Sequence, residues 1–252
     1  MGIQSIDRAV SILELLSRSE QGLPISEVCS KLNLPLGTVH RFLWSLIDNG
    51  LVAQDEKTKF YHLGVKMLRL TAGMLNSDRL IEISRTPMLE AAEELKNIVY
   101  LCRESNDEVV CVSCVNEVSN FQAKAKFAAQ IGNDMPFHAA AAGKIIAAFA
   151  SEQKLESLIA RNSPLIKYTD KTKTTREDVL ADLKKCREQG YAVCDEELEL
   201  GVIAVAAPIR NYDGSVQASV AITGIKANVS VKEVIDCITK CSFKISSALG
   251  FS

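Results

Sequence analysis

The sequence predicts an α+β protein of two domains joined by a helical connector. Three observations support this fold class. The first 66 residues have the pattern of three helices and a short hairpin, residues 67–97 have helical periodicity only, and strands alternate with helices from residue 98 onward. We therefore expect an N-terminal domain over residues 3–66, a linker helix over 67–97 and a C-terminal domain over 98–252.

Composition excludes several classes of protein. The chain has 252 residues, of which 47% are hydrophobic and 24% charged, so it can bury a sizeable core and extensive disorder is not expected. Its 13 glycines and 6 prolines are too few for a fibrous or low-complexity chain. The net charge of −2 excludes a protein that is basic throughout, but it allows a small nucleic-acid-binding domain beside an acidic one.

The N-terminus indicates the compartment. Residues 1–8 do not combine a basic region, an apolar region and a small-residue cleavage site, so they do not resemble a signal peptide. No segment has the roughly 20 consecutive apolar residues of a membrane helix. We therefore expect a cytoplasmic protein.

Eight cysteines are many for such a protein, and they are scattered along the chain. Cys111 and Cys114 form the one CxxC motif, inside an apolar segment that is typical of a buried strand. A redox pair would sit at a helix N-terminus, and a zinc site would need two further ligands at suitable spacing. We interpret the cysteines as core thiols and expect no metal and no cofactor.

The N-terminal domain is predicted from capping residues and apolar spacing. A first helix covers residues 6–18, and Ser26 can cap a second helix that ends at Asn33, a residue that tolerates the left-handed conformation. Pro35 suits the first turn of a third helix, which Asn49-Gly50 stops.

Two short strands follow, over residues 51–54 and 60–63, around a charged tip at 55–59. Three helices followed by such a hairpin predict a winged helix-turn-helix. The connector that comes next is helical throughout, with a possible break at Thr86-Pro87.

Charge counted by segment supports a nucleic-acid partner. Residues 1–75 hold 8 basic and 7 acidic residues, a net charge of +1, which leaves −3 for the remainder. Position is more informative, because a recognition helix enters the major groove and a wing reaches the flanking backbone or the minor groove. The predicted DNA-binding residues are Ser26 and Pro35 at two helix starts, Thr38, His40 and Arg41 on the third helix, and Lys57 and Lys59 on the wing. The alternative is a winged helix that makes protein contacts only, with a solvated polar face.

The C-terminal domain is predicted to mix helices and strands. The expected strands cover residues 98–102, 108–115, 202–209 and 215–223, with a less certain one at 122–129. The expected helices cover residues 139–150, 151–160, 175–189 and 231–249. Asn106-Asp107 and Asp213-Gly214 are the predicted hairpin turns.

No enzyme motif emerges from this domain. Gly143-Lys144 lacks the first glycine and the Ser or Thr of a phosphate-binding loop. His138 has no recognisable nucleophile as a partner, so we interpret it as a residue that orients the loop before a helix. We expect no catalytic residues. The alternative function is a small-molecule sensor or an enzyme whose winged helix serves protein contacts.

Five segments, in order, resemble one family, the bacterial IclR-type transcriptional regulators, over almost the full chain. They are SIDRAVSIL (5–13); LPLGTVHRFL (34–43) with Leu46 and 50–52; YHLG (61–64) with Leu68; MPFHAAAAGK (135–144); and GY (190–191), DEE (195–197) and GVIAVAAPI (201–209).

This resemblance implies a winged-helix domain, a linker helix and a GAF-like effector-binding domain. It also implies a ligand-responsive repressor that binds double-stranded DNA at pseudo-palindromic operators, as a homodimer or as a homotetramer made of two dimers. The family often has a basic or polar residue and then Ser where this chain has Leu36 and Gly37. That departure removes two possible DNA contacts and suggests a distinct operator.

The resemblance also implies the effector site. Small organic acids lie against the start of the helix after the His-Ala motif, where free N–H groups and the helix dipole attract a carboxylate. The positions that match are Ala141 and Ala142 at the helix start and, on the opposite walls, Cys194, Ala204, Ala221 and Thr223. Keto-acid-binding relatives tend to have Asp at 194 and small polar residues at 204 and 221, so we expect a larger or more apolar acid, such as an aromatic acid or a deoxy sugar acid. The alternative is that the four alanines simply pack the core.

Overall fold

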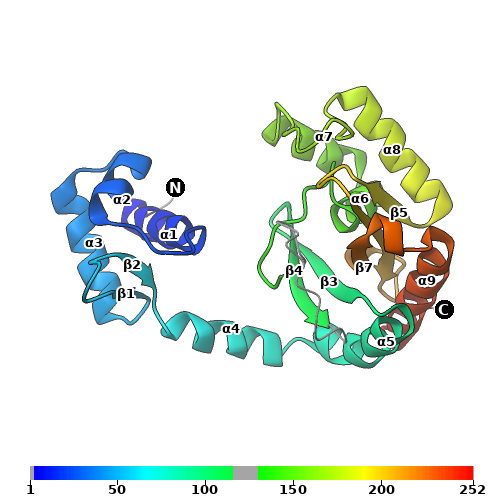
Figure 1. Ribbon diagram of the computed structural model, residues 1–252, viewed down its shortest axis with the longest axis horizontal. Helices are drawn as coiled ribbons and strands as arrows, with labels where there is room; N and C mark the ends of the chain where they lie inside the picture. The colour runs from blue at the N-terminus through cyan, green and yellow to red at the C-terminus, as the bar shows by residue number, and fades with distance from the viewer. Residues whose placement is uncertain (1–2, 116–129, 252) are drawn as a thin grey trace. The chain divides into compact units, whose positions relative to one another are not determined.

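The computed structural model describes residues 3–115 and 130–251, which form two compact units, Met1–Ser77 and Asp78–Ser252 (Figure 1). The strand expected at residues 122–129 lies outside the described residues.

The first unit has the element order of a winged helix-turn-helix, as the sequence predicts. Its elements are α1 (Gln4–Ser17), α2 (Ile25–Leu32), α3 (Leu36–Asp48), β1 (Val52–Gln54), β2 (Tyr61–Leu63) and α4 (Lys66–Asn76). Apolar side chains from α1, α2 and α3 meet in one core, with Ile12, Val28, Val39 and Leu43 fully buried. This core fixes α3 against α2 and leaves the other side of α3 exposed.

The helix ends follow the predicted capping only in part. Asn33 ends α2 in the left-handed conformation with φ 50°, as expected. Ser26 does not cap α2, since the N-cap is Pro24 and Ser26 lies exposed within the first turn. Pro35 is the N-cap of α3 and not its first helical residue.

Close backbone packing holds the wing to the end of α3. The N–H of Gly64 donates to the oxygen of Leu51 at 2.8 Å. A Cβ atom on Gly64 would lie 2.2 Å from the oxygen of Gly50, so only glycine fits there. Leu23 exchanges two backbone hydrogen bonds with Tyr61, which adds a short third strand to the wing.

The segment expected as one linker helix contains two helices. α4 ends at Asn76, and α5 (Arg79–Leu95) begins after Asp78, whose side chain accepts a hydrogen bond from the N–H of Leu80. The helix break expected at Thr86-Pro87 is absent there, because Pro87 lies inside α5. α5 belongs to the second unit, where Met88 and Ala92 are buried.

The second unit is built on a five-stranded antiparallel sheet with the strand order β4-β3-β7-β6-β5. The strands are β3 (Ile98–Ser105), β4 (Glu108–Val115), β5 (Ala192–Asp195), β6 (Val202–Arg210) and β7 (Val216–Ile225). Strand β5 was not predicted, because it begins two residues after the helix end at Gly190 and its four residues are too few to show alternation.

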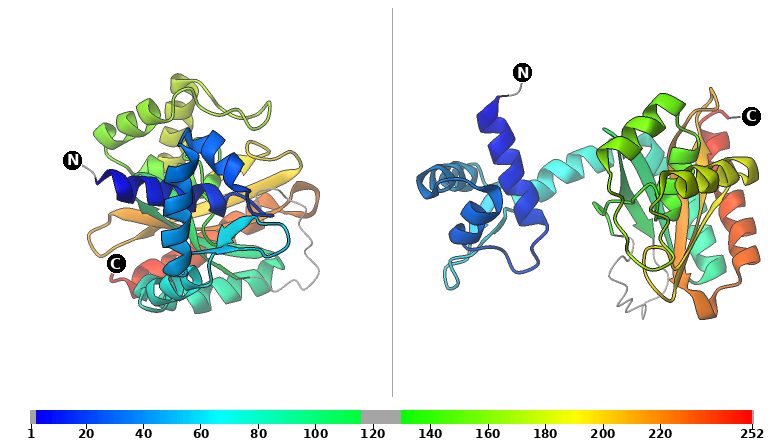
Figure 2. Two further views of the ribbon diagram at one scale, coloured as in Figure 1. Left: turned by 90° about the vertical axis from the view of Figure 1, so that its left-hand side faces the viewer. Right: turned by 90° about the horizontal axis from the view of Figure 1, so that it is seen from above.

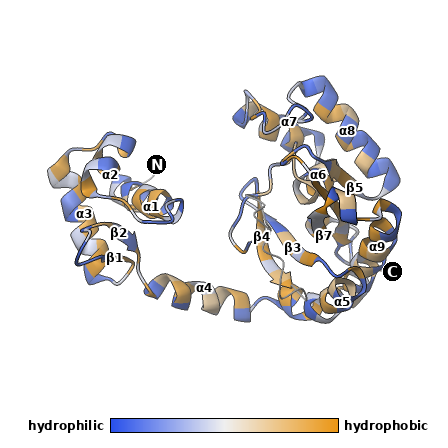
Figure 3. Ribbon diagram, viewed as in Figure 1, coloured by the Kyte–Doolittle hydropathy of each residue, from blue (hydrophilic) through white to orange (hydrophobic). Residues whose placement is uncertain are grey.

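Helices cover both faces of this sheet (Figures 1 and 2). α5 and α9 (Val231–Ala248) cover one face, and α6 (Ala141–Ala148), α7 (Glu152–Arg161) and α8 (Arg176–Gln189) lie on the other. Alternate residues of β3 serve the two layers: Val99 and Leu101 face α5 and α9, whereas Tyr100 and Cys102 face α6. Because both faces are covered, β3 and β4 are mainly hydrophobic (Figure 3).

Within the described ranges, no helix is long and apolar enough to cross a lipid bilayer.

Candidate functional site

One face of α3 carries the polar residues expected to contact DNA. His40 and Arg41 are exposed and Thr38 is half-buried, whereas Val39 and Leu43 point into the core. The spacing of the two sets follows from the 3.6-residue helical repeat. The structure therefore presents these three side chains to solvent on a rigid helix.

Trp44 shares this exposed face, and the sequence reasoning missed it. Its side chain is 57% exposed, and its indole Nε1 donates a hydrogen bond to Nε2 of His40 at 3.1 Å. A nitrogen that accepts this bond carries no proton, so Nδ1 of His40 bears the hydrogen. The i, i+4 spacing of His40 and Trp44 is the signal that could have revealed the pair.

Asp55 shapes the tip of the wing. Its carboxylate accepts hydrogen bonds from the N–H groups of Thr58 at 2.7 Å and Lys57 at 2.9 Å. The bonds from the backbone and side chain of Thr58, and then that from Lys57, hold the pKa of Asp55 below its ordinary value. Lys59, with φ 61°, donates its N–H to the oxygen of Asp55 at 3.0 Å, and both lysine side chains are exposed.

The two remaining predicted DNA-binding residues, Ser26 and Pro35, are exposed at the starts of α2 and α3.

In the second unit, α6 begins without a side-chain cap. Ala140 is the N-cap and makes no side-chain hydrogen bond, and the first N–H groups of a helix have no partner within it. The loop before α6 packs tightly on this end, because a Cβ atom on Gly143 would lie 2.4 Å from the oxygen of Met135. The helix start is therefore a fixed set of backbone donors.

A small cavity of about 20 Å³ adjoins this helix start. Four of the six predicted effector residues line it, namely Ala141, Cys194, Ala204 and Thr223. Ala142 and Ala221 are fully buried and do not line it. The other lining residues are Tyr100, Met135, Ala140, Leu198, Glu199 and Val202.

The polar groups of this cavity differ in charge. Burial raises the pKa of the Cys194 thiol, so the thiol is neutral, and its Sγ donates to the oxygen of Ala139 at 2.8 Å. The hydroxyl of Thr223 lies 3.5 Å from the oxygen of Ile203, at the limit for a hydrogen bond. Glu199 contributes a carboxylate to the lining, which the sequence reasoning did not anticipate.

A buried ion-pair cluster ties α6 to the loop that carries Leu198 and Glu199. Lys144 is fully buried, with its Nζ 2.7 Å from Asp182 and 2.5 Å from Glu197. Lys173 lies 3.1 Å from Glu197 and 3.4 Å from Asp182, so the four charges balance. Burial alone would lower the pKa of Lys144, but the charges of Glu197 and Asp182 outweigh it and raise that pKa.

His138 has the orienting position that the sequence suggested. Its ring is 5% exposed, and its Nε2 lies 2.9 Å from the oxygen of Ile166, which joins the loop before α6 to the segment after α7. Burial is the main reason that the pKa of His138 is lowered, so the ring is neutral near pH 7. Across residues 3–115 and 130–251, no three side chains of His, Cys, Asp or Glu are grouped as metal ligands.

Two sequence models of known domains match the chain. The one described as "Bacterial transcriptional regulator IclR C-terminal" matches residues 72–247, and the one described as "IclR helix-turn-helix domain" matches residues 5–56.

Individual proteins are also similar over nearly the whole chain. The HTH-type transcriptional regulator XynR of Escherichia coli is 27% identical over 256 residues, covering 99% of this chain and 98% of XynR. The HTH-type transcriptional repressor AllR of Escherichia coli is 27% identical over 258 residues, covering 99% of this chain and 91% of AllR. The crystal structure of an IclR homolog complexed with 4-hydroxybenzoate, from Microbacterium hydrocarbonoxydans, superposes with a TM-score of 0.79 at 21% identity, covering 97% and 98% of the two chains.

Proposed function

The chain belongs to the IclR family of bacterial transcriptional regulators, and we propose that it is a repressor whose operator affinity is set by a small carboxylic acid. It is a transcriptional regulator with an effector domain and not an enzyme. In this proposal, two DNA-binding units of a homodimer, or of a dimer of dimers, bind a pseudo-palindromic operator. The acid binds in the second unit at the start of α6.

The exposed face of α3 carries the DNA-binding half of the proposal. Arg41 and His40 can hydrogen-bond to base edges, and Arg is the residue that pairs most often with guanine in the major groove. Lys57 and Lys59 are exposed on the wing of the same unit, where they can contact DNA phosphates. Trp44 adds a large apolar surface and holds the ring of His40.

The uncapped start of α6 supports a carboxylate ligand. Backbone N–H groups and the helix dipole favour an anion there, and the neutral thiol of Cys194 does not repel one. The hydroxyl of Thr223 can donate a further hydrogen bond. The structural neighbour that holds 4-hydroxybenzoate is consistent with an aromatic acid as the ligand class.

The small size of the cavity suggests how binding of the acid is coupled to a conformational change of the second unit. A space of about 20 Å³ holds roughly one water molecule, so an organic acid fits only when lining residues move apart. Leu198 and Glu199 lie on the loop that Glu197 anchors to Lys144. An acid that binds better to the opened form shifts the protein toward it, which is the differential affinity that allosteric coupling requires.

Binding to the DNA upstream of its own gene, measured across a salt series, tests the proposed function. The intact protein should bind that duplex more tightly than a scrambled one, with an affinity that falls steeply as salt rises. Equal binding to both duplexes would contradict the proposal and favour a winged helix used for protein contacts.

A further inference from the structure

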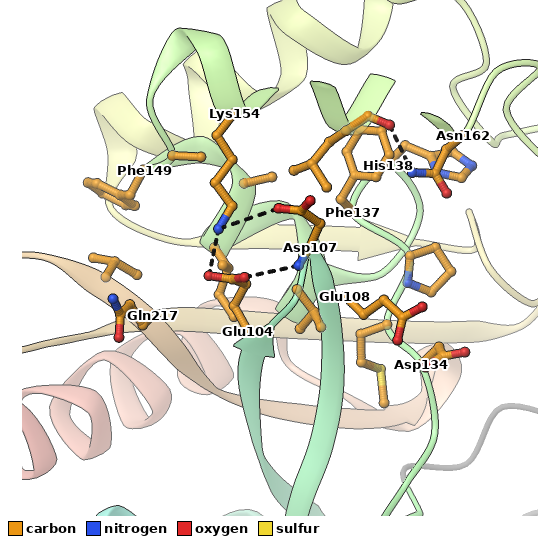
Figure 4. A pocket seen from close by; sticks show the side chains of 18 of the residues that line it. Glu104, Asp107, Glu108, Asp134, Phe137, His138, Phe149, Lys154, Asn162 and Gln217 are labelled. Carbon is orange, nitrogen blue, oxygen red and sulfur yellow. Dashed lines mark hydrogen bonds and ion pairs between the residues drawn. The ribbon is translucent and has the colours of Figure 1, made fainter. Parts of the chain in front are cut away.

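The second unit contains another, larger pocket of about 400 Å³ (Figure 4). It lies among the β3–β4 hairpin, the C-terminal half of α6, α7 and the start of β7. Met135 is the one described residue that lines both this pocket and the small cavity. Its volume falls within the range of about 300–1,000 Å³ that is usual for small-molecule sites.

One wall of the pocket is apolar and aromatic. It is formed by Phe137, Ile146, Phe149, Leu158 and Val216, which come from four separate parts of the unit. Such a wall binds the hydrocarbon or ring portion of a ligand by removing apolar surface from water.

The charged residues of the pocket are mostly acidic. Among the described lining residues, Lys154 is the one cation, and it lies beside four carboxylates, those of Glu104, Asp107, Glu108 and Asp134. Lys154 pairs with Glu104 at 2.7 Å and with Asp107 at 3.9 Å, and Asp107 also pairs with Arg161. The carboxylates at this end of the pocket therefore already have cationic partners.

Glu108 and Asp134 lie at the other end of the pocket (Figure 4). Asp134 forms a β-bridge with Val110, which places it diagonally across from Glu108 on the same side of the strand. Neither carboxylate forms an ion pair with any residue that the structure describes. Two neighbouring carboxylates that no described residue neutralises make this end electronegative.

His138 also lines the pocket, and it is buried. Its Nε2 must carry the proton, because that nitrogen faces the carbonyl of Ile166 and a carbonyl oxygen only accepts. Nδ1 of the neutral ring is then an acceptor, and it is buried, with no hydrogen-bond partner among the described residues.

We propose that this pocket is a second ligand site, which takes an organic amine with an apolar or aromatic body. The ammonium group lies between Glu108 and Asp134, and the apolar body lies against Phe137 and its neighbours. The site goes beyond the proposed function, because it is a different cavity and selects the opposite charge. The protein would then respond to two ligands, a carboxylate at the start of α6 and an amine here.

Isothermal titration of the full chain with 2-phenylethylamine tests the charge preference. Its matched anion is 3-phenylpropionate, which has the same phenyl ring and two-carbon chain. The amine should bind at one saturable site, at least about tenfold more tightly than 3-phenylpropionate binds at this pocket. Absence of saturable amine binding at millimolar concentrations would overturn the proposal.

Three variants locate the site. Glu108→Gln with Asp134→Asn should weaken amine binding by about tenfold or more, whereas the matched pair Glu152→Gln with Glu188→Gln, on exposed helix positions, should not. Lys154→Met should strengthen amine binding, because it removes the one cation found among the lining residues that the structure describes. Thermal melts of the unliganded variants verify that each is folded.

A variant of the small cavity distinguishes amine binding in the large pocket from ligand binding at the start of α6. Ala204→Leu, which fills the small cavity, should leave amine binding unchanged. Amine binding that survives the Glu108 and Asp134 substitutions, or that is lost in Ala204→Leu, would overturn the second site. Loss of operator binding or of the carboxylate response would count against the proposed function alone.

Discussion

The Nζ atom of Lys144 lies 2.5 Å from Oε2 of Glu197, and both side chains are buried in the core of the second unit. Lys144 is on the helix whose start is proposed to bind the acid, and Glu197 precedes the two loop residues that line the same cavity. The ion pair thus fixes the loop relative to the helix.

Lys144→Met should lower the free energy of unfolding by about 3–5 kcal/mol, because it leaves the buried carboxylate of Glu197 and the half-buried one of Asp182 with Lys173 alone. Lys184→Met is the control, since the exposed pair of Lys184 with Glu188 is worth less than about 1 kcal/mol. Urea denaturation measures both. Equal losses of unfolding free energy in the two variants would show that the buried ion pair stabilises the protein no more than the exposed one does.

The same pair predicts a dependence on pH. The pKa of Lys144 is raised above its ordinary value of 10.5 in the folded protein, so its stabilising effect is complete below that pH. The effect is lost as pH rises through the folded-state pKa. The difference in unfolding free energy between wild type and Lys144→Met should therefore be constant from neutral pH to about 10.5 and shrink above it. A difference that grows with alkaline pH would contradict the assignment.

Gly143→Ala should destabilise the second unit by about 1–3 kcal/mol, because its Cβ would lie 2.4 Å from the backbone oxygen of Met135. Gly73→Ala in α4 is the matched control, with nothing within 4 Å of the added Cβ. It should stabilise by roughly 0.5–1 kcal/mol through the better helix propensity of alanine. Thermal or urea melts that show the same sign for both would be inconsistent with the packing described.

Arg41→Ala should cost about 1–3 kcal/mol of affinity on the cognate operator and relax its sequence preference, if Arg41 reads a base. Lys57→Ala, on the wing, should weaken binding to all duplexes alike and reduce the salt dependence. Fluorescence anisotropy on cognate and scrambled duplexes separates the two. Uniform weakening by Arg41→Ala would identify it as a phosphate contact.

Glu199→Gln should tighten the binding of carboxylic acids at the start of α6, because it removes a negative charge from the lining of that cavity. Thr223→Val should weaken it by removing the hydroxyl, whereas Thr239→Val on the exposed face of α9 should have no effect. Titration with acids from a thermal-shift screen provides the measurement. Weaker acid binding in Glu199→Gln would show that the acid lies elsewhere.

Local patterns predicted the N-terminal unit well. Apolar spacing located α1, α2 and α3, and Asn33 and Gly50 end helices as expected, because these signals depend on neighbouring residues alone. The predicted cap at Ser26 was wrong because α2 begins two residues earlier, with Pro24 as its N-cap. The break in the connector was also misplaced, since α5 tolerates Pro87 while Asp78 starts a new helix.

The site in the second unit was harder to predict, because it depends on residues far apart in the chain. Lys144, Asp182 and Glu197 come from α6, α8 and a loop, and no local pattern indicates that they meet. The same holds for the large pocket, where Glu108 and Asp134 meet through a single β-bridge. Likewise, sequence alone could not separate Ala141 and Ala204, which line the cavity, from Ala142 and Ala221, which do not.

The central claim is that an acid bound at the start of α6 changes operator affinity. Its most direct test is the operator dissociation constant of wild type and Ala204→Leu, each with and without a saturating carboxylic acid that raises the melting temperature of wild type. We predict a change of about fivefold or more in wild type and none in Ala204→Leu, with the same affinity for DNA when the acid is absent. An operator affinity that the acid leaves unchanged in wild type, or changes equally in both proteins, would contradict the claim.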